Sequence, residues 1–503
     1  MRLQPLLRAG TFEAAMRKTF IAAACACVLA SSTCIAKQVV EGEASLLELQ
    51  GEFKQAASLL TTALQDKSLP SPERRKLEFE LDRLDRIKQD FPLAKEALFA
   101  DLKESVRNLT SEEYEQWLKE SRFDYRDIDG TRLFMGDSVR NLYMRYPELN
   151  ARRLHPKDTA PLDKARLASV LAIKQAASAA KTPYVLPKRF EVTMTVTAKA
   201  DAAPAGETIR AWIPIPRQYP FQSDIKLLPT SSPVTHLDDL QGPIRSAYFE
   251  QAAQAGKPTQ FKVEYEYTAE AVRFDIHPSD VRPCDLNDPA LKEATAEGPH
   301  VVFTPELRKL SQQIVGDETN PYWKAKKCYD WIADHIKYSY AIEYSTIRNI
   351  SDYCRSKGYG DCGQEALLFI SLCRLNGVPA RWQSGWNTFP GDKSNHDWSE
   401  IYLAPYGWMP VDPYMGIWAM RYATTLKPEQ KREVRDFYFG GLDQYRMIAN
   451  SDHSQALNPP KRTMRSDDVD FQRGEMECGD KNLYFNQFSY SLTMKELKLS
   501  GVE

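Results

Sequence analysis

The sequence predicts a multidomain α+β protein, and three observations lead to this fold class. Apolar residues recur at helical spacing through much of residues 43–180. Short alternating segments, typical of strands, follow between residues 190 and 271. Beyond residue 298, a helix pattern is followed by two alternating segments joined by a turn. A chain of 503 residues with 43% hydrophobic content is expected to form about three globular domains.

The first 36 residues have the pattern of an export signal. Arg17-Lys18 precede an apolar run that is too short and too rich in small residues to span a membrane as a helix. Cys34-Ile35-Ala36 offers a cleavage site, and Cys34, or one of the two cysteines before it, could instead carry a lipid. We therefore predict an exported protein, periplasmic or outer-membrane-associated, and leave membrane attachment as a lipoprotein open.

Residues 37–183 are predicted to form a helical accessory domain. The helical pattern of Glu43–Gln116 is broken only at prolines, and Leu162–Ala180 adds one more helix. One stretch resembles a tetratricopeptide helix pair, but no second copy occurs at that period, so a repeat array is not expected. A helical bundle that caps the rest of the chain is favoured over a separate partner-binding module.

Residues 188–275 are predicted to form a β-sandwich-like domain, because three segments alternate apolar and polar residues between loops rich in Pro, Gly and Ser. These segments are Phe190–Thr197, Thr208–Pro214 and Gln260–Ala271.

Residues 298–430 are expected to form a mixed helix-and-strand domain, and residues 431–503 a β-rich C-terminal extension. Aromatic residues alternate in the extension, which predicts strands that complete or cover one face of the preceding domain. Tyr445, Arg446 and Arg473 could line a groove there, although packing is the favoured interpretation of all three.

Cys362 opens the most informative segment of the chain. Glycines on both sides of it interrupt regular structure, and a helical pattern then runs from Gln364 until Asn376-Gly377 stops it. Cys362 is therefore predicted at a helix N-terminus, where free N–H groups and the helix dipole favour a thiolate and can hold an oxyanion. The alternative is a small buried core residue, which fits Cys373 well. For Cys362 we favour a nucleophile.

His396 and Asp412 can supply the base and the orienting acid for that nucleophile. Residues 396–403 alternate, and the turn at Ala404–Gly407 returns the chain along a second strand that ends at Asp412. Pairing the two strands brings Asp412 within about three residues of the position opposite His396, so the carboxylate can orient the imidazole. Alone, His396 would more often be a satisfied surface or core residue and Asp412 a turn former. In this order after Cys362, they predict a Cys-His-Asp triad.

These segments resemble the transglutaminase-like superfamily, a branch of the papain-like cysteine enzymes. The match covers roughly Pro299–Leu426 and rests on GDCGQEALLFISLCRLNGVPAR, HDWSEIYL and GWMPVDP. The resemblance implies a transglutaminase-like core in which Cys362 is the nucleophile, His396 the general base and acid, and Asp412 the orienting residue. It also implies an aromatic oxyanion donor upstream of the cysteine. The candidates for that donor are Tyr338, Tyr340 and Tyr344.

Tryptophans flank the predicted triad. Trp398 lies two residues from His396 on the same strand face, so it is expected to shield the imidazole or the acyl pocket. Trp386 is predicted, with Trp398, to contact the substrate. Core packing alone explains Trp408 equally well.

Composition limits the other functions. The 66 basic and 68 acidic residues give a formal net charge of −2, and no large basic run occurs, which argues against nucleic-acid binding. The sequence has neither a C-x-x-C pair nor an EF-hand calcium loop, so no metal and no cofactor are predicted. The cysteines are too scattered for a disulfide scaffold.

The sequence thus favours an exported cysteine hydrolase, a peptidase or an amidase, which cleaves amide bonds in a peptide or protein substrate through a thioester. In a protein-glutamine acyl transferase, the first alternative, an amine would replace the water. The second is a non-catalytic envelope binding protein that uses the same fold as a scaffold.

Overall fold

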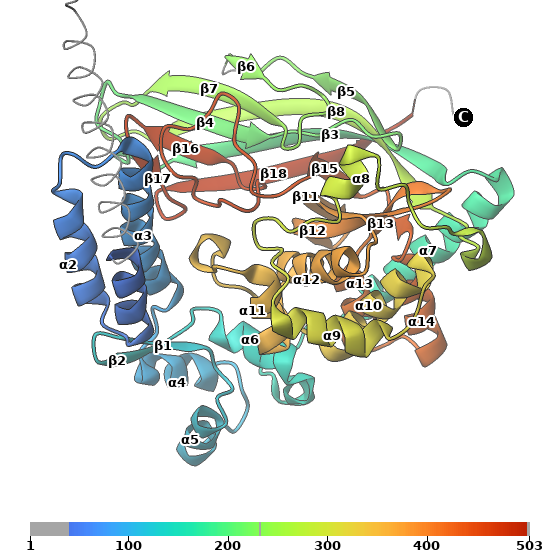
Figure 1. Ribbon diagram of the computed structural model, residues 1–503, viewed down its shortest axis with the longest axis horizontal. Coiled ribbons are helices and arrows are strands. Elements are labelled where there is room, and N and C mark those ends of the chain that lie inside the picture. Colours follow the sequence, from blue (N-terminus) through green and yellow to red (C-terminus); the bar gives the residue numbers. More distant parts are fainter. Residues whose placement is uncertain (1–39, 231–232, 500–503) are drawn as a thin grey trace, which may run out of the picture. The chain divides into compact units, whose positions relative to one another are not determined.

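The structure, a computed structural model, describes residues 40–230 and 233–499 (Figure 1). The predicted signal peptide, with its three cysteines, lies outside the described residues. None of the helices in the described ranges is both long and apolar enough to cross a membrane. The chain divides into two compact units.

The first unit comprises the described residues up to Lys95 together with Asp124–Phe134. The helices of this unit bury apolar side chains such as Phe53, Leu60 and Leu84. The unit also contains a two-stranded antiparallel hairpin. Residues 40–49 are helical, and the further elements of the unit are α2 (Phe53–Leu64), α3 (Ser71–Asp90), β1 (Tyr125–Ile128) and β2 (Thr131–Phe134).

The second unit contains the rest of the predicted accessory range and everything after it. Helix α7 (Ala160–Ala180) packs Val170 and Ile173 into a core that it shares with Trp418 and Phe437. The other helices of this stretch are α4 (Lys95–Lys103), α5 (Ser111–Lys119), α6 (Ser138–Arg145) and the 3-10 helix η1 (Pro147–Arg152).

Two five-stranded sheets share one apolar core, the sandwich core, to which Met194, Ile213 and Phe249 contribute. Strands from the C-terminal segment complete both sheets, because β18 pairs with β3 and β16 pairs with β4. One sheet runs β14-β8-β3-β18, with β5 beside β8, and the other runs β17-β16-β4-β7-β6. The strands are β3 (Tyr184–Ala198), β4 (Thr208–Pro214), β5 (Gln222–Leu227), β6 (His236–Leu237), β7 (Ser246–Ala252), β8 (Thr259–Arg273), β14 (Gly441–Leu442), β16 (Glu475–Cys478), β17 (Lys481–Leu483) and β18 (Phe488–Leu497).

A smaller sheet of order β13-β12-β11-β15 carries the predicted site, and helix α12 packs against its strands β11 and β12. In Figure 1 the helices α9, α10, α12 and α13 gather next to this sheet. Its strands are β11 (Ala380–Phe389), β12 (Asp392–Leu403), β13 (Gly407–Val411) and β15 (Arg446–Asn450). The helices are α8 (Pro289–Glu293), α9 (Pro305–Val315), α10 (Pro321–His335), α11 (Ile350–Lys357), α12 (Cys362–Leu375), α13 (Pro413–Ile417) and α14 (Pro428–Phe437). The α+β fold class predicted from the sequence is confirmed.

The register of this sheet depends on Gly385. It pairs with His396 on β12, at a point where the pairing of β11 with β15 is irregular. A Cβ at Gly385 would lie 1.9 Å from the carbonyl oxygen of Met447. Because that oxygen belongs to the backbone of the neighbouring strand, only glycine allows the two strands to approach this closely.

Candidate active site

Cys362 is the first residue of helix α12, as the sequence predicts. Asp361 caps the helix, since its Oδ1 accepts a hydrogen bond from the backbone N–H of Gln364 at 3.2 Å. The helix ends before Asn376, and Cys373 is fully buried, in line with its predicted packing role. Cys362, by contrast, is partly exposed and lines a pocket. A substrate can therefore reach its thiol.

Gly363 allows two side chains to close around the thiol. A Cβ at this position would lie 2.1 Å from the hydroxyl oxygen of Tyr344 and 2.8 Å from Asp397 Oδ2. The same Tyr344 hydroxyl donates to Asp361 Oδ1 at 2.6 Å. Any larger residue after Cys362 would therefore displace the groups that surround its sulfur.

His396 and Asp412 are brought together in the buried interior, as the hairpin of β12 and β13 predicts. Ser399 pairs with Val411, so Asp412, the next residue, emerges beside β12 near His396. His396 Nε2 and Asp412 Oδ2 lie 2.8 Å apart, and Asp412 Oδ1 accepts the backbone N–H of Met415 at 3.1 Å. The carboxylate thus holds Nε2, which leaves Nδ1 as the ring nitrogen that can take up a proton.

Aromatic rings fix the orientation of the imidazole. Trp398 stacks on His396 with ring centroids 5.6 Å apart, and Tyr414 meets it edge-on at 5.2 Å. Burial lowers the pKa of His396, Asp412 acts to raise it, and the charge of Arg446 acts to lower it; the net shift is downward. The imidazole is therefore neutral at rest near pH 7 and able to act as a base.

The thiol has a different partner in this structure. Cys362 Sγ donates to Asp397 Oδ2 at 3.4 Å, and no hydrogen bond joins Sγ to His396 among the described residues. Burial, followed by the charges of Asp397 and Asp361, raises the pKa of the Cys362 thiol well above its usual value. The helix N-terminus alone favours the thiolate, as the sequence suggests, but its contribution of about 0.3–1 kcal/mol is outweighed by lost hydration and by two nearby carboxyls.

Cys362 opens into a pocket of about 420 Å³ whose walls are rich in carboxyl groups. The carboxyls on its lining are Asp137, Glu343, Asp361, Asp397, Asp467 and Asp470. Burial is the main cause of the raised pKa of Asp361, about 6, and of Asp470, about 7. In the described part of the chain, no group of three His, Cys, Asp or Glu side chains is arranged to hold a metal ion.

The two tryptophans predicted to contact the substrate do not line this pocket. Trp398 is fully buried, and its indole N–H donates to Gln383 Oε1 at 2.6 Å. Trp386 packs into the sandwich core, and its N–H donates to the carbonyl of Gln472 at 3.2 Å. Trp398 supports the imidazole, while Trp386 anchors the segment that carries Gln472.

The three tyrosines proposed as oxyanion donors all line the pocket, but their hydroxyls have different surroundings. The Tyr344 hydroxyl proton is engaged by Asp361. Burial raises the pKa of Tyr338, and the nearby Cys362 sulfur adds to that effect. Tyr338 therefore keeps a neutral hydroxyl in the pocket lining.

Residues 308–413, which include all three predicted triad residues, match the family model described as the transglutaminase-like superfamily. Residues 308–413 form a transglutaminase-like domain. The resemblance seen in the sequence is thereby confirmed.

Curated proteins similar to the chain match only a limited part of its length. The uncharacterized protein YebA of Bacillus subtilis is 26% identical over 129 residues, which cover 22% of this chain and 17% of YebA. An uncharacterized protein of Haemophilus influenzae is 24% identical over 170 residues, which cover 29% of this chain and 46% of that protein. The chain thus spans less than half the length of either relative.

Solved structures similar to the chain align with it at low TM-scores. A candidate cysteine protease from Cytophaga hutchinsonii aligns with 63% of this chain and 94% of its own, at 14% identity and a TM-score of 0.41. The periplasmic domain of TgpA from Pseudomonas aeruginosa aligns with 49% of this chain and 99% of its own, at 14% identity and a TM-score of 0.26.

Several lining residues come from outside the transglutaminase-like domain, in the loop between β15 and β16. Gln472 Nε2 donates to the carbonyl of His396 at 2.8 Å and also to Asp397 Oδ1. Arg473 forms two hydrogen bonds with Glu343, of 2.9 and 2.7 Å, and contacts Asp467 at 3.1 Å. No local sequence pattern links these residues to Cys362, because only strand pairing brings their loop to the pocket.

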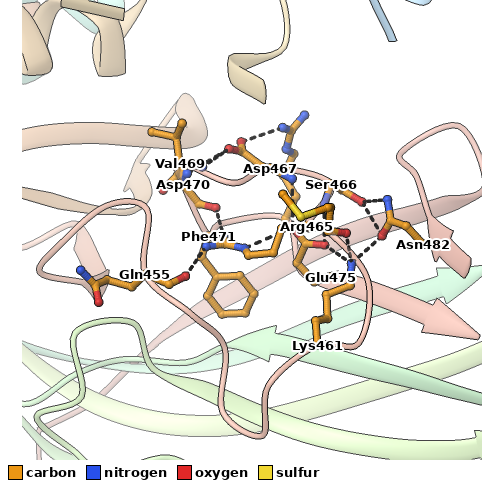
Figure 2. A network of polar contacts seen from close by, with 12 residues as sticks. Gln455, Lys461, Arg465, Ser466, Asp467, Val469, Asp470, Phe471, Glu475 and Asn482 are labelled. Carbon is orange, nitrogen blue, oxygen red and sulfur yellow. Dashed lines mark hydrogen bonds and ion pairs between the residues drawn. The ribbon is translucent and has the colours of Figure 1, made fainter. Parts of the chain in front are cut away.

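Glu475 and two basic residues hold that loop in place, as Figure 2 shows. The Glu475 carboxylate accepts from Lys461 Nζ at 2.7 Å and from the backbone N–H groups of Ser466 and Asp467 at 2.8 and 2.9 Å. Arg465 reaches the carbonyls of Gln455 and Asp470. These buried ion pairs and hydrogen bonds fix the segment that presents Asp467 and Asp470 to the pocket.

Helix α6 supports another part of the pocket lining. Asn141 exchanges two hydrogen bonds with the Tyr340 backbone, at 3.0 Å to its carbonyl and 2.7 Å from its N–H. Arg140 lies over the Tyr340 ring, 3.4 Å from its centroid, and both Arg140 and Asp137 line the pocket. The sequence places these residues in the accessory range and carries no signal of a role in the site.

The sequence suggested either a groove or a packing role for Tyr445, Arg446 and Arg473. The structure places them differently. Arg473 lines the pocket. Tyr445 packs at the edge of the sandwich core, in contact with Phe389 and Phe190. Arg446 is buried and lies 3.0 Å from Asp412.

Proposed function

We propose that this protein is an exported cysteine hydrolase that cleaves amide bonds in peptide or protein substrates, with Cys362, His396 and Asp412 as its triad. The observation that carries the proposal is the buried 2.8 Å contact of His396 with Asp412, in a domain that also presents Cys362 at a helix N-terminus. The transglutaminase-like domain supports a papain-like cysteine enzyme.

The reaction begins with transfer of the Cys362 proton to Nδ1 of His396. Because the thiol donates to Asp397 at rest, the bound substrate must redirect the sulfur towards the imidazole. The thiolate then attacks the carbonyl carbon, and the tetrahedral oxyanion is stabilised by the Cys362 N–H and the Tyr338 hydroxyl. Asp412 stabilises the imidazolium while the proton resides on it.

Collapse of the oxyanion breaks the C–N bond, and the imidazolium proton passes to the leaving amine. Water then gives a proton to His396 and attacks the thioester carbonyl. The C–S bond breaks, the acid product leaves, and the proton returns to sulfur. No other reactant is needed.

Transfer to an amine is the second candidate, and the pocket lining favours it specifically. Six carboxyls line the pocket, against the two guanidinium groups of Arg140 and Arg473. Carboxyl oxygens can accept hydrogen bonds from a primary amine, which could replace water as the acyl acceptor after losing a proton.

The deciding experiment is digestion of a peptide library in H₂¹⁸O, with and without a primary amine probe. Hydrolysis places ¹⁸O in new carboxyl termini, whereas transfer attaches the amine. Cys362→Ala and His396→Ala should abolish either product, and Cys284→Ala is the matched control at a partly exposed cysteine outside the pocket. Absence of both products would favour a non-catalytic binding protein.

A further inference from the structure

Asp412 Oδ2 is shared by two cationic or potentially cationic side chains. It lies 2.8 Å from His396 Nε2 and 3.0 Å from Nη2 of Arg446. All three side chains are buried, with exposed fractions of 4%, 0% and 1% for His396, Asp412 and Arg446. Arg446 is therefore the next charged group beyond the carboxylate that orients the imidazole.

Arg446 is fixed from several directions. Its Nε lies 3.4 Å from Asp443 Oδ2, which in turn accepts the Tyr438 hydroxyl at 2.9 Å. Its guanidinium carbon stands 5.2 Å from the centre of the Trp398 ring, the indole that stacks on His396. A side chain held in this way keeps its charge at one distance from the imidazole.

Arg446 reaches the site from β15, outside the transglutaminase-like domain. It pairs with Asn387 of β11, the strand that also pairs with the His396 strand. Its contact with Asp412 is therefore a product of sheet assembly.

Four titratable groups act on or touch His396 from the elements around it. Asp412 comes from the end of β13, Tyr414 from α13, Arg446 from β15 and Arg166 from α7. Arg166 has its own counter-ion, Asp392, just as Arg446 has Asp443. Asp412, Asp443 and Arg446 together carry a formal charge of −1, which a proton on His396 neutralises.

We propose that Arg446 is a positioning residue of the active site, which clamps the Asp412 carboxylate in place and, by its charge, keeps the neighbouring imidazole neutral until it receives the thiol proton. The proposal rests on the proposed function for its catalytic meaning. Without Arg446, Asp412 would face His396 alone and a larger share of the imidazole would be protonated, and that share could not take the proton from Cys362.

The test is NMR titration of His396 in the full chain carrying Cys362→Ala, with its signal assigned by His396→Gln. Arg446→Met should move the His396 titration to higher pH by roughly one unit, because a cation is lost. Arg446→Lys keeps the charge and should restore most of the original value. An unchanged or lowered His396 titration in Arg446→Met would overturn the proposal.

Asp443→Asn gives a second, opposite readout, and it serves also where Arg446→Met does not fold. Removing this carboxylate leaves the Arg446 charge less compensated, so His396 should titrate at lower pH. A purely structural role of Arg446 does not predict that Arg446→Met and Asp443→Asn shift the His396 titration in opposite directions. If Asp443→Asn raises the His396 titration or leaves it unmoved, the proposal is wrong.

The proposed function is tested separately, by cleavage in the chain that keeps Cys362. There, the acidic limb of the pH–rate profile should move upward in Arg446→Met by the same amount as the NMR titration. Shifted titrations in a chain that cleaves nothing would refute the hydrolase and uphold the Arg446–His396 coupling. Cleavage with an unshifted acidic limb would uphold the hydrolase and refute the role of Arg446.

Discussion

The two sides of the candidate site hold buried carboxyls in opposite states. On the histidine side, burial acts to raise the pKa of Asp412, but the charges of His396 and Arg446 lower it below its usual value. On the cysteine side, burial and the neighbouring Asp470 and Asp361 raise the pKa of Asp397 well above its usual value. Burial is common to both, so the nearby cations decide which carboxyl stays ionised at neutral pH.

The two sides therefore have different electrostatic roles. An ionised Asp412 can stabilise an imidazolium, which the proposed mechanism needs. Asp397 has no such cation to hold it ionised, and in its ionised form its charge opposes the thiolate. The predictions below change one side at a time, in order of expected effect.

Asp412→Asn removes the ionised carboxylate from the histidine side. We expect kcat to fall by about 10³–10⁴-fold, since an amide can neither stabilise the imidazolium nor hold the same tautomer. Steady-state cleavage of the best library peptide measures the effect. Asp470→Asn, on the other side, is the matched control and should cost far less; equal losses in the two variants would mean that the two sides do not differ in this way.

Tyr338→Phe tests the oxyanion donor on the cysteine side. We expect a loss of about 10²-fold in kcat with little change in KM, because the donor acts on the transition state. Tyr344→Phe is the control: its hydroxyl is engaged by Asp361, so its removal should have a smaller effect. The opposite ranking of the two variants would identify Tyr344 as the donor.

Asp397→Asn removes the carboxyl group that, in its ionised form, raises the pKa of Cys362. The pKa of Cys362 should fall, and iodoacetamide labelling of Cys362 at pH 7 should become about tenfold faster, as one unit of pKa predicts. Labelling rates across pH, followed by mass spectrometry at Cys362, provide the measurement. A slower reaction in Asp397→Asn would show that Asp397 instead activates the thiol.

Asp470→Asn should change the pH dependence of stability. The pKa of Asp470 is about 7 in the folded protein, above its unfolded value, so the folded state binds the proton more tightly. Its stabilising effect is present below the unfolded pKa and is lost as pH rises through about 7. Relative to the unsubstituted protein, Asp470→Asn should therefore gain about 2–3 kcal/mol between pH 5 and pH 8, measured by urea unfolding. For Asp412→Asn, the loss of unfolding free energy relative to the unsubstituted protein should grow between pH 2 and pH 5, because the pKa of Asp412 is lowered in the folded state.

Local sequence patterns were informative wherever the neighbours of a residue lie close to it in the chain. The helical run after Cys362 predicted α12, and the turn at Ala404–Gly407 predicted the approach of Asp412 to His396. The electrostatic state of the thiol could not be obtained in this way. It depends on Asp397, whose role is set by depth of burial and by Asp470, 73 residues further along the chain.

By itself, the sequence determined the α+β class, the transglutaminase-like domain and the pairing of His396 with Asp412, because helix periodicity and a short hairpin are local properties. The tertiary structure alone decided which distant residues surround them. Pairing of β15 with β11 delivers Arg446 to Asp412, and the loop before β16 delivers Gln472 and Arg473 to the pocket of Cys362. The physical reason is that non-local strand pairing and burial set the charges around a group, and neither leaves a periodic trace in the chain.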